Sequence, residues 1–215
     1  MKLISINVGK PRLVEWNGMA VSTGIFKSPV KHRVRVRTLN IDGDEQADLN
    51  VHGGISKAVY AYPMEHYEFW RNEYPDMELP WGMFGENLTV EGLSEAEVNI
   101  GDRLRIGSVE LEVTEPRMPC FKLGIKFGRM DVIKRFLQSE RTGIYFSVIR
   151  EGDLAAGDSI EWTHREAHKV SVADLARLHT RDKTDMDSMR RALQIEALPQ
   201  EWRERFWDRL TPDAG

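Results

Sequence analysis

Short stretches in which polar and apolar residues alternate recur through the first three quarters of the chain. In Arg33–Ile41 basic and apolar residues alternate at the start, which is the two-residue period of a strand with one solvent-facing side. Gly107 and Ser108 separate two alternating stretches and predict a hairpin turn. Many short strands at this spacing favour a barrel or a sandwich. The other strand-like stretches are residues 57–62, 103–115, 143–149 and 151–162.

Two segments with helical spacing interrupt the strand pattern. The segment from Pro63 to Pro75 opens with a proline that suits a first helical turn and stops before the second proline. The segment 131–140 begins at Asp131, a good N-cap, and places apolar residues on one face. The aromatic residues of the first segment are expected to pack against the strands; they are Tyr67, Phe69, Trp70 and Tyr74.

After about residue 165 the strand pattern gives way to helical periodicity. Ser171 and Asp174 form a capping-box pattern, and residues 185–198 carry apolar positions at helical spacing. The last segment starts at Pro199 and places Trp202, Phe206 and Leu210 four residues apart. These patterns predict a small unit of three helices at the C-terminal end.

The predicted organisation is a mainly β protein with helices, in two domains. Residues 1–165 are expected to form a closed β-barrel, and residues 166–215 the three-helix extension. A helix-turn-helix reader of DNA is the alternative for the extension. The extension carries nine Lys and Arg against ten Asp and Glu, so it lacks the basic footprint of DNA binding, and a lid or oligomerisation element is favoured.

The overall composition is that of an ordinary globular protein. Of the 215 residues 41% are hydrophobic and 30% charged, which argues against disorder, collagen and coiled coils. The chain has no apolar run long enough for a signal peptide or a membrane span, so we expect a cytoplasmic protein that is not bound to a membrane. The net charge of −4 gives no general attraction to nucleic acid.

The chain has one cysteine, Cys120, in the stretch EPRMPCFKLG. A lone cysteine is most often inert core packing. Here Pro116 and Pro119 lack an N–H and shape the segment, while Arg117 and Lys122 are placed to favour the thiolate. The alternative to core packing is therefore a shaped loop that presents the sulfur.

The densest polar stretch, residues 40–63, contains a glycine turn followed by a lysine. Calcium binding is excluded because the glycine and glutamate that an EF-hand loop needs are missing at its sixth and twelfth positions, counted from Asp42. His52, Gly53, Gly54 and Lys57 form a pattern in which backbone N–H groups and two basic side chains cradle a phosphate. An ordinary turn is the alternative.

Two further stretches add candidate binding residues. Gly85, Glu86 and Asn87 precede a strand-like segment, and the Asn87 amide suits a polar ring edge, unless the stretch is only a glycine-rich connection. Lys27 and Ser28 belong to a stretch that by composition is a solvated basic face. A thiol, an anion cradle and further basic residues together suit a phosphorylated cofactor that carries a metal. One protein thiolate can complete the coordination of such a metal if the cofactor supplies the other soft ligands.

The order of these segments resembles the MOSC domain family, which is named after the C-terminal domain of molybdenum cofactor sulfurases. The segments are FKSPV, GDEQAD followed by HGG, FGENLT and PRMPCFKL. More narrowly, the whole chain looks like the stand-alone bacterial members of the YiiM type, which carry a three-helix extension. The resemblance implies a β-barrel, a cofactor of the molybdopterin type, and relatives that reduce N-hydroxylated compounds or handle sulfur.

Carried over by position, the resemblance makes Cys120 both the metal ligand and a catalytic residue. Cofactor-binding residues are expected at Lys27, Ser28, His52, Gly53, Gly54, Lys57, Gly85, Glu86 and Asn87, with Arg117 added because it adjoins the thiol. His52 is also the expected proton donor, since imidazole titrates near neutral pH. Glu86 fits a cofactor-binding role least well, because a phosphate repels a nearby carboxylate unless the carboxylate is turned away or paired with a cation.

The function that the resemblance implies is molybdenum-dependent reduction of N-hydroxylated compounds, such as N-hydroxylated purines, to amines by oxygen-atom transfer. No motif for a flavin, a dinucleotide or an iron–sulfur cluster is recognisable, so electrons are expected from a separate reductase. A homodimer is one oligomeric state compatible with the sequence. The alternatives are a non-catalytic carrier of the cofactor or of persulfide sulfur, and a structural protein with an inert cysteine.

Overall fold

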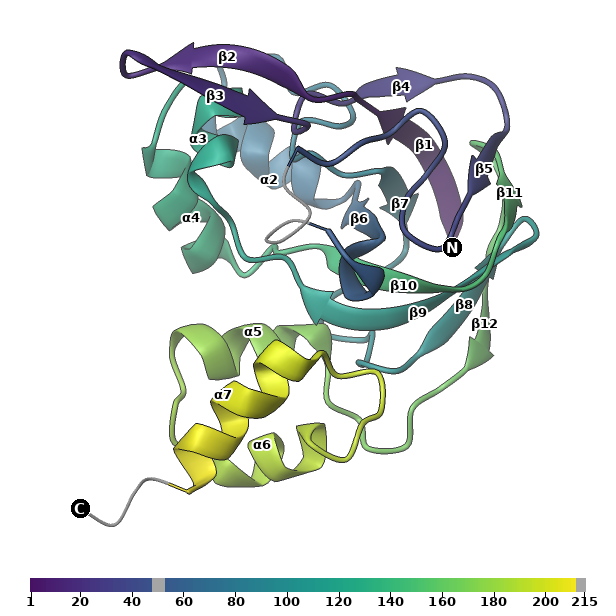
Figure 1. Ribbon diagram of the computed structural model, residues 1–215, viewed down its shortest axis with the longest axis vertical. Coiled ribbons are helices and arrows are strands. Elements are labelled where there is room, and N and C mark those ends of the chain that lie inside the picture. Colours follow the sequence, from purple (N-terminus) through teal and green to yellow (C-terminus); the bar gives the residue numbers. More distant parts are fainter. Residues whose placement is uncertain (48–52, 212–215) are drawn as a thin grey trace.

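A computed structural model describes residues 1–47 and 53–211 of the chain (Figure 1). Its main element is an eight-stranded sheet with the strand order β12-β8-β9-β10-β6-β7-β1-β4. The three C-terminal helices lie beneath the sheet part, next to β9 (Figure 1). The strands of this sheet are β1 (Lys2–Val8), β4 (Ser28–Val30), β6 (Val59–Pro63), β7 (Leu88–Glu91), β8 (Arg103–Ile106), β9 (Val109–Pro116), β10 (Ile144–Arg150) and β12 (Ile160–His164).

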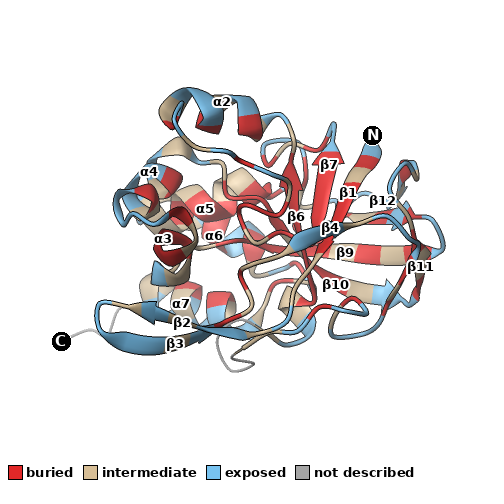
Figure 2. Cartoon of the chain, turned by 90° about the horizontal axis from the view of Figure 1, so that it is seen from above, coloured by how far each residue is buried: buried red, intermediate tan, exposed pale blue. Residues whose placement is uncertain are grey.

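The β8–β9 hairpin forms where alternation and the Gly107–Ser108 pair predict it. Ile106 pairs with Val109 across the turn, and Gly107 has a φ of 58°, which an L side chain rarely adopts. Along β9 the residues Val109, Leu111 and Val113 are fully buried, while the glutamates between them, Glu110 and Glu112, are partly exposed. The period of two therefore places one face of the hairpin in the core, as Figure 2 shows for the central strands.

The sheet does not close into a barrel by strand pairing, so the predicted closed barrel is not confirmed. The end strands β12 and β4 pair with β8 and β1 respectively, and not with each other. The start of β1 meets the segment before β12 only through an isolated bridge between Lys2 and Ser159 and nearby backbone hydrogen bonds. Strand β4 contains Pro29, which has no N–H to extend the ladder.

Two small two-stranded sheets accompany the main one. β5 (Val34–Val36) pairs with β11 (Gly152–Leu154), and β2 (Arg12–Trp16) pairs with β3 (Met19–Thr23) as a mostly exposed hairpin (Figure 2). The strand predicted over Arg33–Ile41 is thus too long. The chain turns after β5, because the Arg37 N–H donates to the Asn40 carbonyl, and Val36 bridges to Ile41.

The two helices predicted inside the strand region are present, with corrected starts. α2 spans His66–Glu73, and Pro63 is the last residue of β6 instead of the first of the helix. α4 spans Asp131–Ser139; its N-cap is Met130, and the Asp131 carboxylate pairs with Arg129 and Arg135. Asp131 thus stands in the first turn of α4 without occupying its cap, and Pro63 lies outside α2.

The aromatic residues of α2 pack in a second hydrophobic cluster beside the sheet. Trp70 stacks on Phe136 of α4 with ring centroids 6.0 Å apart, and Tyr62 stacks on Phe84 at 4.4 Å. Tyr67 and Trp70 are fully buried, so the expected packing role of these aromatics is confirmed. The cluster fixes α2, α4 and the segment before β7 on one flank of the sheet.

An unpredicted helix, α3 (Phe121–Phe127), begins directly after the cysteine. Strand β9 continues to Pro116 and α3 starts at Phe121, so only the residues between them form the loop expected around Cys120. Leu123 and Phe127 are buried against the aromatic cluster and hold the helix there. Gly128, with a φ of 66°, ends it in the left-handed conformation.

The C-terminal extension contains the three predicted helices, α5 (Val172–Thr180), α6 (Met186–Ala192) and α7 (Gln200–Leu210). Trp202 and Phe206 of α7 are buried in the same hydrophobic cluster as the sheet residues. The domain limits 1–165 and 166–215 stay a prediction. No helix among the described residues is long and apolar enough to cross a membrane.

Ser171→Ala is expected to lower the free energy of unfolding by about 1 kcal/mol. The Ser171 hydroxyl accepts the Asp174 N–H at 3.0 Å, and the Asp174 carboxylate accepts the Ser171 N–H at 3.1 Å, so the change leaves one helix donor unpaired. Urea unfolding at neutral pH measures the effect. Ser159→Ala, at an exposed position just before β12 that caps no helix, is the control, and an equal loss in both variants would contradict the capping role.

Candidate functional site

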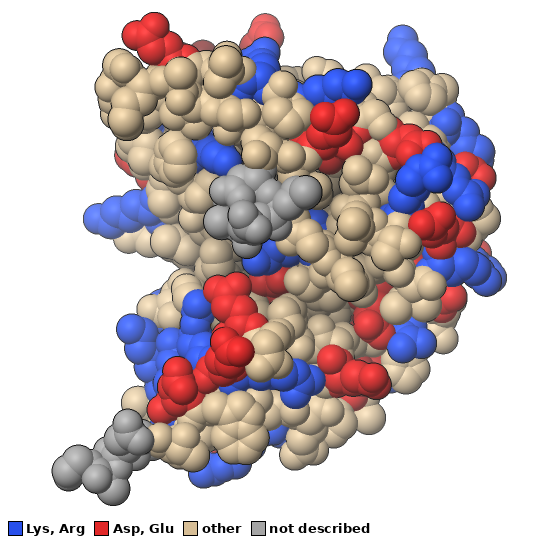
Figure 3. Space-filling view, viewed as in Figure 1, with Lys and Arg blue, Asp and Glu red and all other residues tan. Residues whose placement is uncertain are grey.

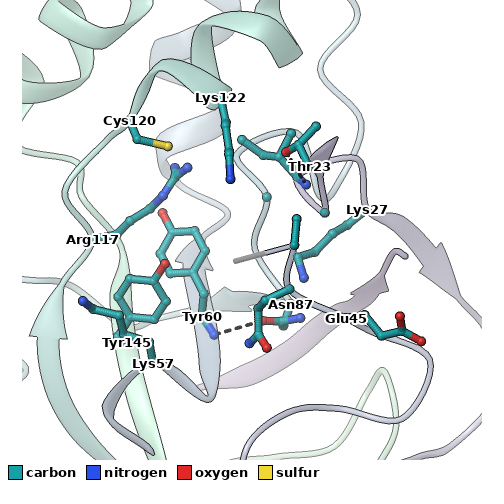
Figure 4. A pocket seen from close by; sticks show the side chains of 15 residues that line it. Thr23, Lys27, Glu45, Lys57, Tyr60, Asn87, Arg117, Cys120, Lys122 and Tyr145 are labelled. Atoms are coloured by element: carbon teal, nitrogen blue, oxygen red, sulfur yellow. Dashed lines mark hydrogen bonds between the residues drawn. The ribbon is translucent and has the colours of Figure 1, made fainter. Parts of the chain in front are cut away.

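Segments that are far apart in the sequence meet around one cavity of about 80 Å³ (Figure 4). Lys57, which ends the short helical turn Ile55–Lys57, lies there with residues that follow β3 and residues of β6 and β10. The lining residues are Thr23, Gly24, Ile25, Lys27, Glu45, Gln46, Ala47, Lys57, Tyr60, Gly85, Asn87, Arg117, Cys120, Lys122 and Tyr145. Six residues predicted from the sequence are thereby brought together: Lys27, Lys57, Gly85, Asn87, Arg117 and Cys120.

Cys120 stands between the end of β9 and the first residue of α3. Its backbone is extended, with φ −122° and ψ 171°, and Pro119 precedes it. The residue is partly exposed, and Figure 4 shows its sulfur beside Arg117 and Lys122 at the cavity. The local structure therefore presents the thiol to the cavity, and the core-packing alternative does not describe it.

Arg117 is a buried cation with an unsatisfied donor. The residue is 7% exposed, and its buried Nη1 donates no hydrogen bond to any described residue. The guanidinium lies over the rings of Tyr60 and Phe136, with its central carbon 5.2 and 5.5 Å from the ring centroids. Aromatic faces offset only part of the cost of burying a charge, so the site favours an anion near this group.

Two tyrosines that the sequence interpretation missed form another part of the cavity. Tyr60 of β6 and Tyr145 of β10 are register partners, with ring centroids 5.0 Å apart. Burial raises the pKa of Tyr145 to about 12, against the opposing charge of Arg117, and raises that of Tyr60 well above its ordinary value. Both phenols are therefore protonated near neutral pH. The strand-like segments around these tyrosines predict that they lie in a sheet, but only the register of β6 and β10 places both rings beside Arg117.

Lys27 is held by a buried carboxylate from the polar stretch of residues 40–63. The Lys27 Nζ forms a buried ion pair with Asp44, which also accepts the Asn87 Nδ2 at 2.9 Å and the Gly9 N–H at 2.9 Å. Burial lowers the pKa of Lys27, and Asp44 partly offsets this. Most of the Lys27 charge is thus balanced inside the protein. Asn87 also accepts the Tyr60 N–H, at 3.1 Å, so its amide organises the cavity wall.

Glu86 is turned away from the cavity. It is fully buried, and its carboxylate accepts the N–H groups of Gly82 and Phe84 at 2.7 and 3.1 Å and the Thr89 hydroxyl at 3.0 Å. The Tyr67 hydroxyl is a further donor. Burial raises the pKa of this carboxyl while these donors oppose the rise. Glu86 therefore fixes the turn before β7, and the cofactor-binding role predicted for it has no support from its position.

The remaining predicted residues do not line the cavity within the described structure. Ser28 lies exposed in β4, opposite Val8 of β1. Gly53 and Gly54 precede the turn that carries Lys57, and Gly54 has a φ of 94°, which favours glycine. His52 lies outside the described residues, and with it the predicted proton donor.

The charges of the cavity fit an anionic cofactor that brings a soft metal. Four cationic side chains line the cavity against one carboxylate, Glu45, while the buried counter-ions of Lys27 and Lys57, Asp44 and Glu115, are not among the lining residues. Phosphate oxygens are acceptors that suit the unsatisfied Arg117 guanidinium. A thiol is the donor that soft metals prefer. The residues present thus fit the kind of cofactor that the sequence resemblance predicts, with Cys120, Arg117, Lys57 and Lys122 as the groups that would hold it.

Comparisons with known families match both parts of the chain. The model of the MOSC domain matches residues 48–161. The model described as the YiiM-like, 3-alpha helix domain matches residues 170–211. The first match contains Tyr60, Asn87, Cys120 and Tyr145, and the second contains α5, α6 and α7.

Individual relatives extend over nearly the whole chain. The uncharacterized protein YflK of Bacillus subtilis is 41% identical over 213 residues, which is 98% of this chain and 96% of that protein. The crystal structure of YiiM from Geobacillus stearothermophilus has a TM-score of 0.82 at 33% identity and covers 97% of this chain and 98% of that one. A Gibberella moniliformis protein named a reductase is 35% identical over 164 residues, which is 75% of this chain but 29% of that protein.

Proposed function

This chain belongs to the MOSC domain family, in its stand-alone YiiM-type form, and we propose on that basis that it reduces N-hydroxylated compounds to amines with a molybdenum cofactor. The family supports a role related to this cofactor. The molybdopterin type of cofactor, the substrate and the reaction are the proposal.

One observation carries the proposal: a presented thiol and a buried, unsatisfied guanidinium share one cation-lined cavity. Cys120 and Arg117 both line it, and Arg117 Nη1 has no acceptor among the described residues. A thiol alone also suits redox sensing, and a cation cluster alone also suits any phosphate. Together they suit a ligand that has both a soft metal and anionic groups.

In the proposed complex each cavity residue has a role that follows from its chemistry. Cys120 supplies the sulfur ligand to the metal, while Arg117, Lys57 and Lys122 hold the anionic groups of the cofactor. When bound, the cofactor supplies a two-electron redox centre that accepts an oxygen atom. Tyr145, with a pKa of about 12, keeps its proton and donates a hydrogen bond into the cavity at neutral pH.

The proposed reaction converts a hydroxyamino compound, two electrons and two protons into the amine and water. The N–O bond breaks, an N–H bond forms, and the oxygen leaves in water. A separate reductase protein supplies the electrons in this proposal, since the sequence contains no recognisable flavin, dinucleotide or iron–sulfur motif. The fungal relative that is named a reductase supports assignment to the oxidoreductases.

Protein produced in a host that makes the molybdenum cofactor is expected to contain about one molybdenum atom per chain and to reduce an N-hydroxylated purine when reduced viologen supplies electrons. Elemental analysis and chromatographic detection of the amine measure the two properties. Protein without molybdenum contradicts the proposal as a whole. Molybdenum without turnover contradicts catalysis and favours the non-catalytic carrier of cofactor or persulfide as the second candidate function.

A further inference from the structure

A second hollow lies on the other side of the thiol. It is a groove of about 460 Å³ between the segment that carries Cys120 and the helices α5 and α7. The groove shares Cys120, Lys57 and Tyr145 with the cavity described above. Figure 3 shows this face of the molecule hollowed between the sheet part and the three-helix extension.

Glu115 is a buried carboxylate in the wall of this groove. Its side chain is 6% exposed, and Trp202 of α7 donates its Nε1–H to Oε2 at 2.9 Å. The other oxygen, Oε1, accepts no hydrogen bond from the described residues; the Lys57 Nζ lies 3.8 Å from it. A buried carboxylate oxygen without a donor is costly, and a ligand with an N–H or O–H group removes that cost.

The charges of the groove differ from those of the cavity. Lys57 and Arg205 face two carboxylates, Glu115 and Glu201, and the Lys57–Glu201 and Arg205–Glu201 distances are 3.8 and 3.2 Å. Burial and the neighbouring Arg205 lower the pKa of His179, which keeps it neutral. The groove is therefore balanced in charge, whereas the cavity has an excess of cations. An anionic ligand favours the cavity, and a neutral ligand with N–H donors suits the groove.

We propose that this groove binds the substrate, a neutral hydroxyamino compound, and that the Glu115 carboxylate accepts a hydrogen bond from its N–H or O–H group. The inference rests on the proposed function and deepens it. Trp202 is then a positioning residue, through which the three-helix extension holds the carboxylate beside Cys120. The extension would thus form one wall of the substrate site.

The geometry allows Glu115 to serve a ligand at small cost. Glu115 lines the groove, and turning its carboxyl group towards the groove breaks no hydrogen bond at Oε1, since this oxygen accepts none from the described residues. The hydrogen bond from Trp202 Nε1–H to Oε2 is kept during this turn. Both donors of a hydroxyamino group can reach a carboxylate in this way, and such charge-assisted bonds are stronger than neutral ones.

Glu115→Leu is expected to raise KM for an N-hydroxylated purine on the order of 10- to 100-fold, while kcat and the molybdenum content stay close to the wild-type values. Glu115→Gln keeps the shape and a neutral acceptor, so its KM rises less, by about threefold to tenfold. The affinity for the amine product should fall more in Glu115→Leu than in Glu115→Gln. Calorimetry on protein with and without molybdenum measures this affinity. If Glu115→Leu does not fold, the KM and product affinity of Glu115→Gln alone test the substrate-binding role of Glu115.

Glu112→Gln is the matched control, because Glu112 lies on the same strand but pairs with Arg103 outside both hollows. Its KM should equal that of the wild type. The substrate-binding role of Glu115 is overturned if the wild type is active and the Glu115 variants keep its KM and its affinity for the product. Loss of molybdenum in those variants also overturns it, by assigning Glu115 to the cofactor. A wild type that holds molybdenum but is inactive contradicts the proposed function instead, and product binding still tests the groove.

The pH dependence of KM gives an independent test. Burial and the neighbouring Glu201 raise the pKa of Glu115, while the charge of Lys57, the Trp202 N–H and the Ser56 hydroxyl oppose the rise. Tyr145 is a further titratable group that faces the carboxyl. The acceptor must be ionised, so KM is low above this pKa and rises as the pH falls through it. Trp202→Phe removes a donor that lowers the pKa, so the rise begins at a higher pH. A purely structural role of Trp202 changes stability and leaves the position of that rise unchanged.

Discussion

Replacing Cys120 with serine is expected to leave the folded protein without molybdenum and to lower the reduction of an N-hydroxylated purine on the order of a thousandfold or more. The hydroxyl is a harder donor than the thiolate and is protonated at neutral pH, so it does not replace sulfur on a soft metal. Because Cys120 is partly exposed, the change should alter the free energy of unfolding by no more than about 0.5 kcal/mol. Elemental analysis and the viologen assay measure the two losses.

The single cysteine also provides a direct control for the state of the thiol. A thiol reagent can label the chain only at Cys120, so labelling reports on this residue alone. Metal-free protein should react with one equivalent, and protein that contains molybdenum should be protected. If Cys120→Ser retains molybdenum, the sulfur is not a ligand, and the assignment of Cys120 as the metal-binding residue is wrong.

Replacing Arg117 with methionine is expected to have opposite effects on cofactor retention and on stability. The variant should lose most of its molybdenum, because the buried Arg117 Nη1, which donates to no described residue, is the group expected to bind an anion of the cofactor. The same change should raise the free energy of unfolding of the cofactor-free protein by about 1–4 kcal/mol, since it removes a buried charge and keeps a side chain of similar volume. Urea unfolding and elemental analysis measure these effects.

Two substitutions separate the charge of Arg117 from its shape and its place. Arg117→Lys keeps the charge without the planar fork, so it should retain an intermediate amount of molybdenum. Arg103→Met, which removes a guanidinium paired with Glu112 at 2.8 Å outside the cavity, should retain all of it. A cofactor-free Arg117→Met protein that is less stable than the wild type would show that Arg117 is a structural cation, and the anion-binding role would have to be abandoned.

The sequence predicted those features that depend on neighbouring residues. The alternation in residues 103–115 with its central Gly107–Ser108 pair gave the β8–β9 hairpin, and the Ser171–Asp174 pattern gave the start of α5. These succeed because a turn residue, a cap or a pleat acts within a few positions of the chain. Predictions were wrong where the type of a residue does not by itself decide between a strand and a helix. Pro63, for example, ends β6 instead of starting α2.

The candidate site was predicted in part, through residues that a resemblance could locate. Lys27, Lys57, Asn87, Arg117 and Cys120 were named from the sequence, and the structure places all of them at one cavity. Tyr60 and Tyr145 were missed because strand tyrosines are ordinary packing residues until the register is known. Their chemical importance comes from Arg117, which lies beside both only after β6, β9 and β10 have paired.

The sequence by itself determined the hairpin, the helices of the extension, the presence of one thiol and the set of basic residues available for an anion. Only the tertiary structure decided how these are used: that Asp44 balances Lys27, that Glu86 faces inward, that Arg117 Nη1 finds no acceptor among the described residues, and that Trp202 reaches Glu115. The physical reason is the range of the interactions. Local patterns act between residues a few positions apart, whereas ion pairing and burial depend on strand register and helix packing, which join residues as far apart in the sequence as Arg33 and Asp158, 125 positions.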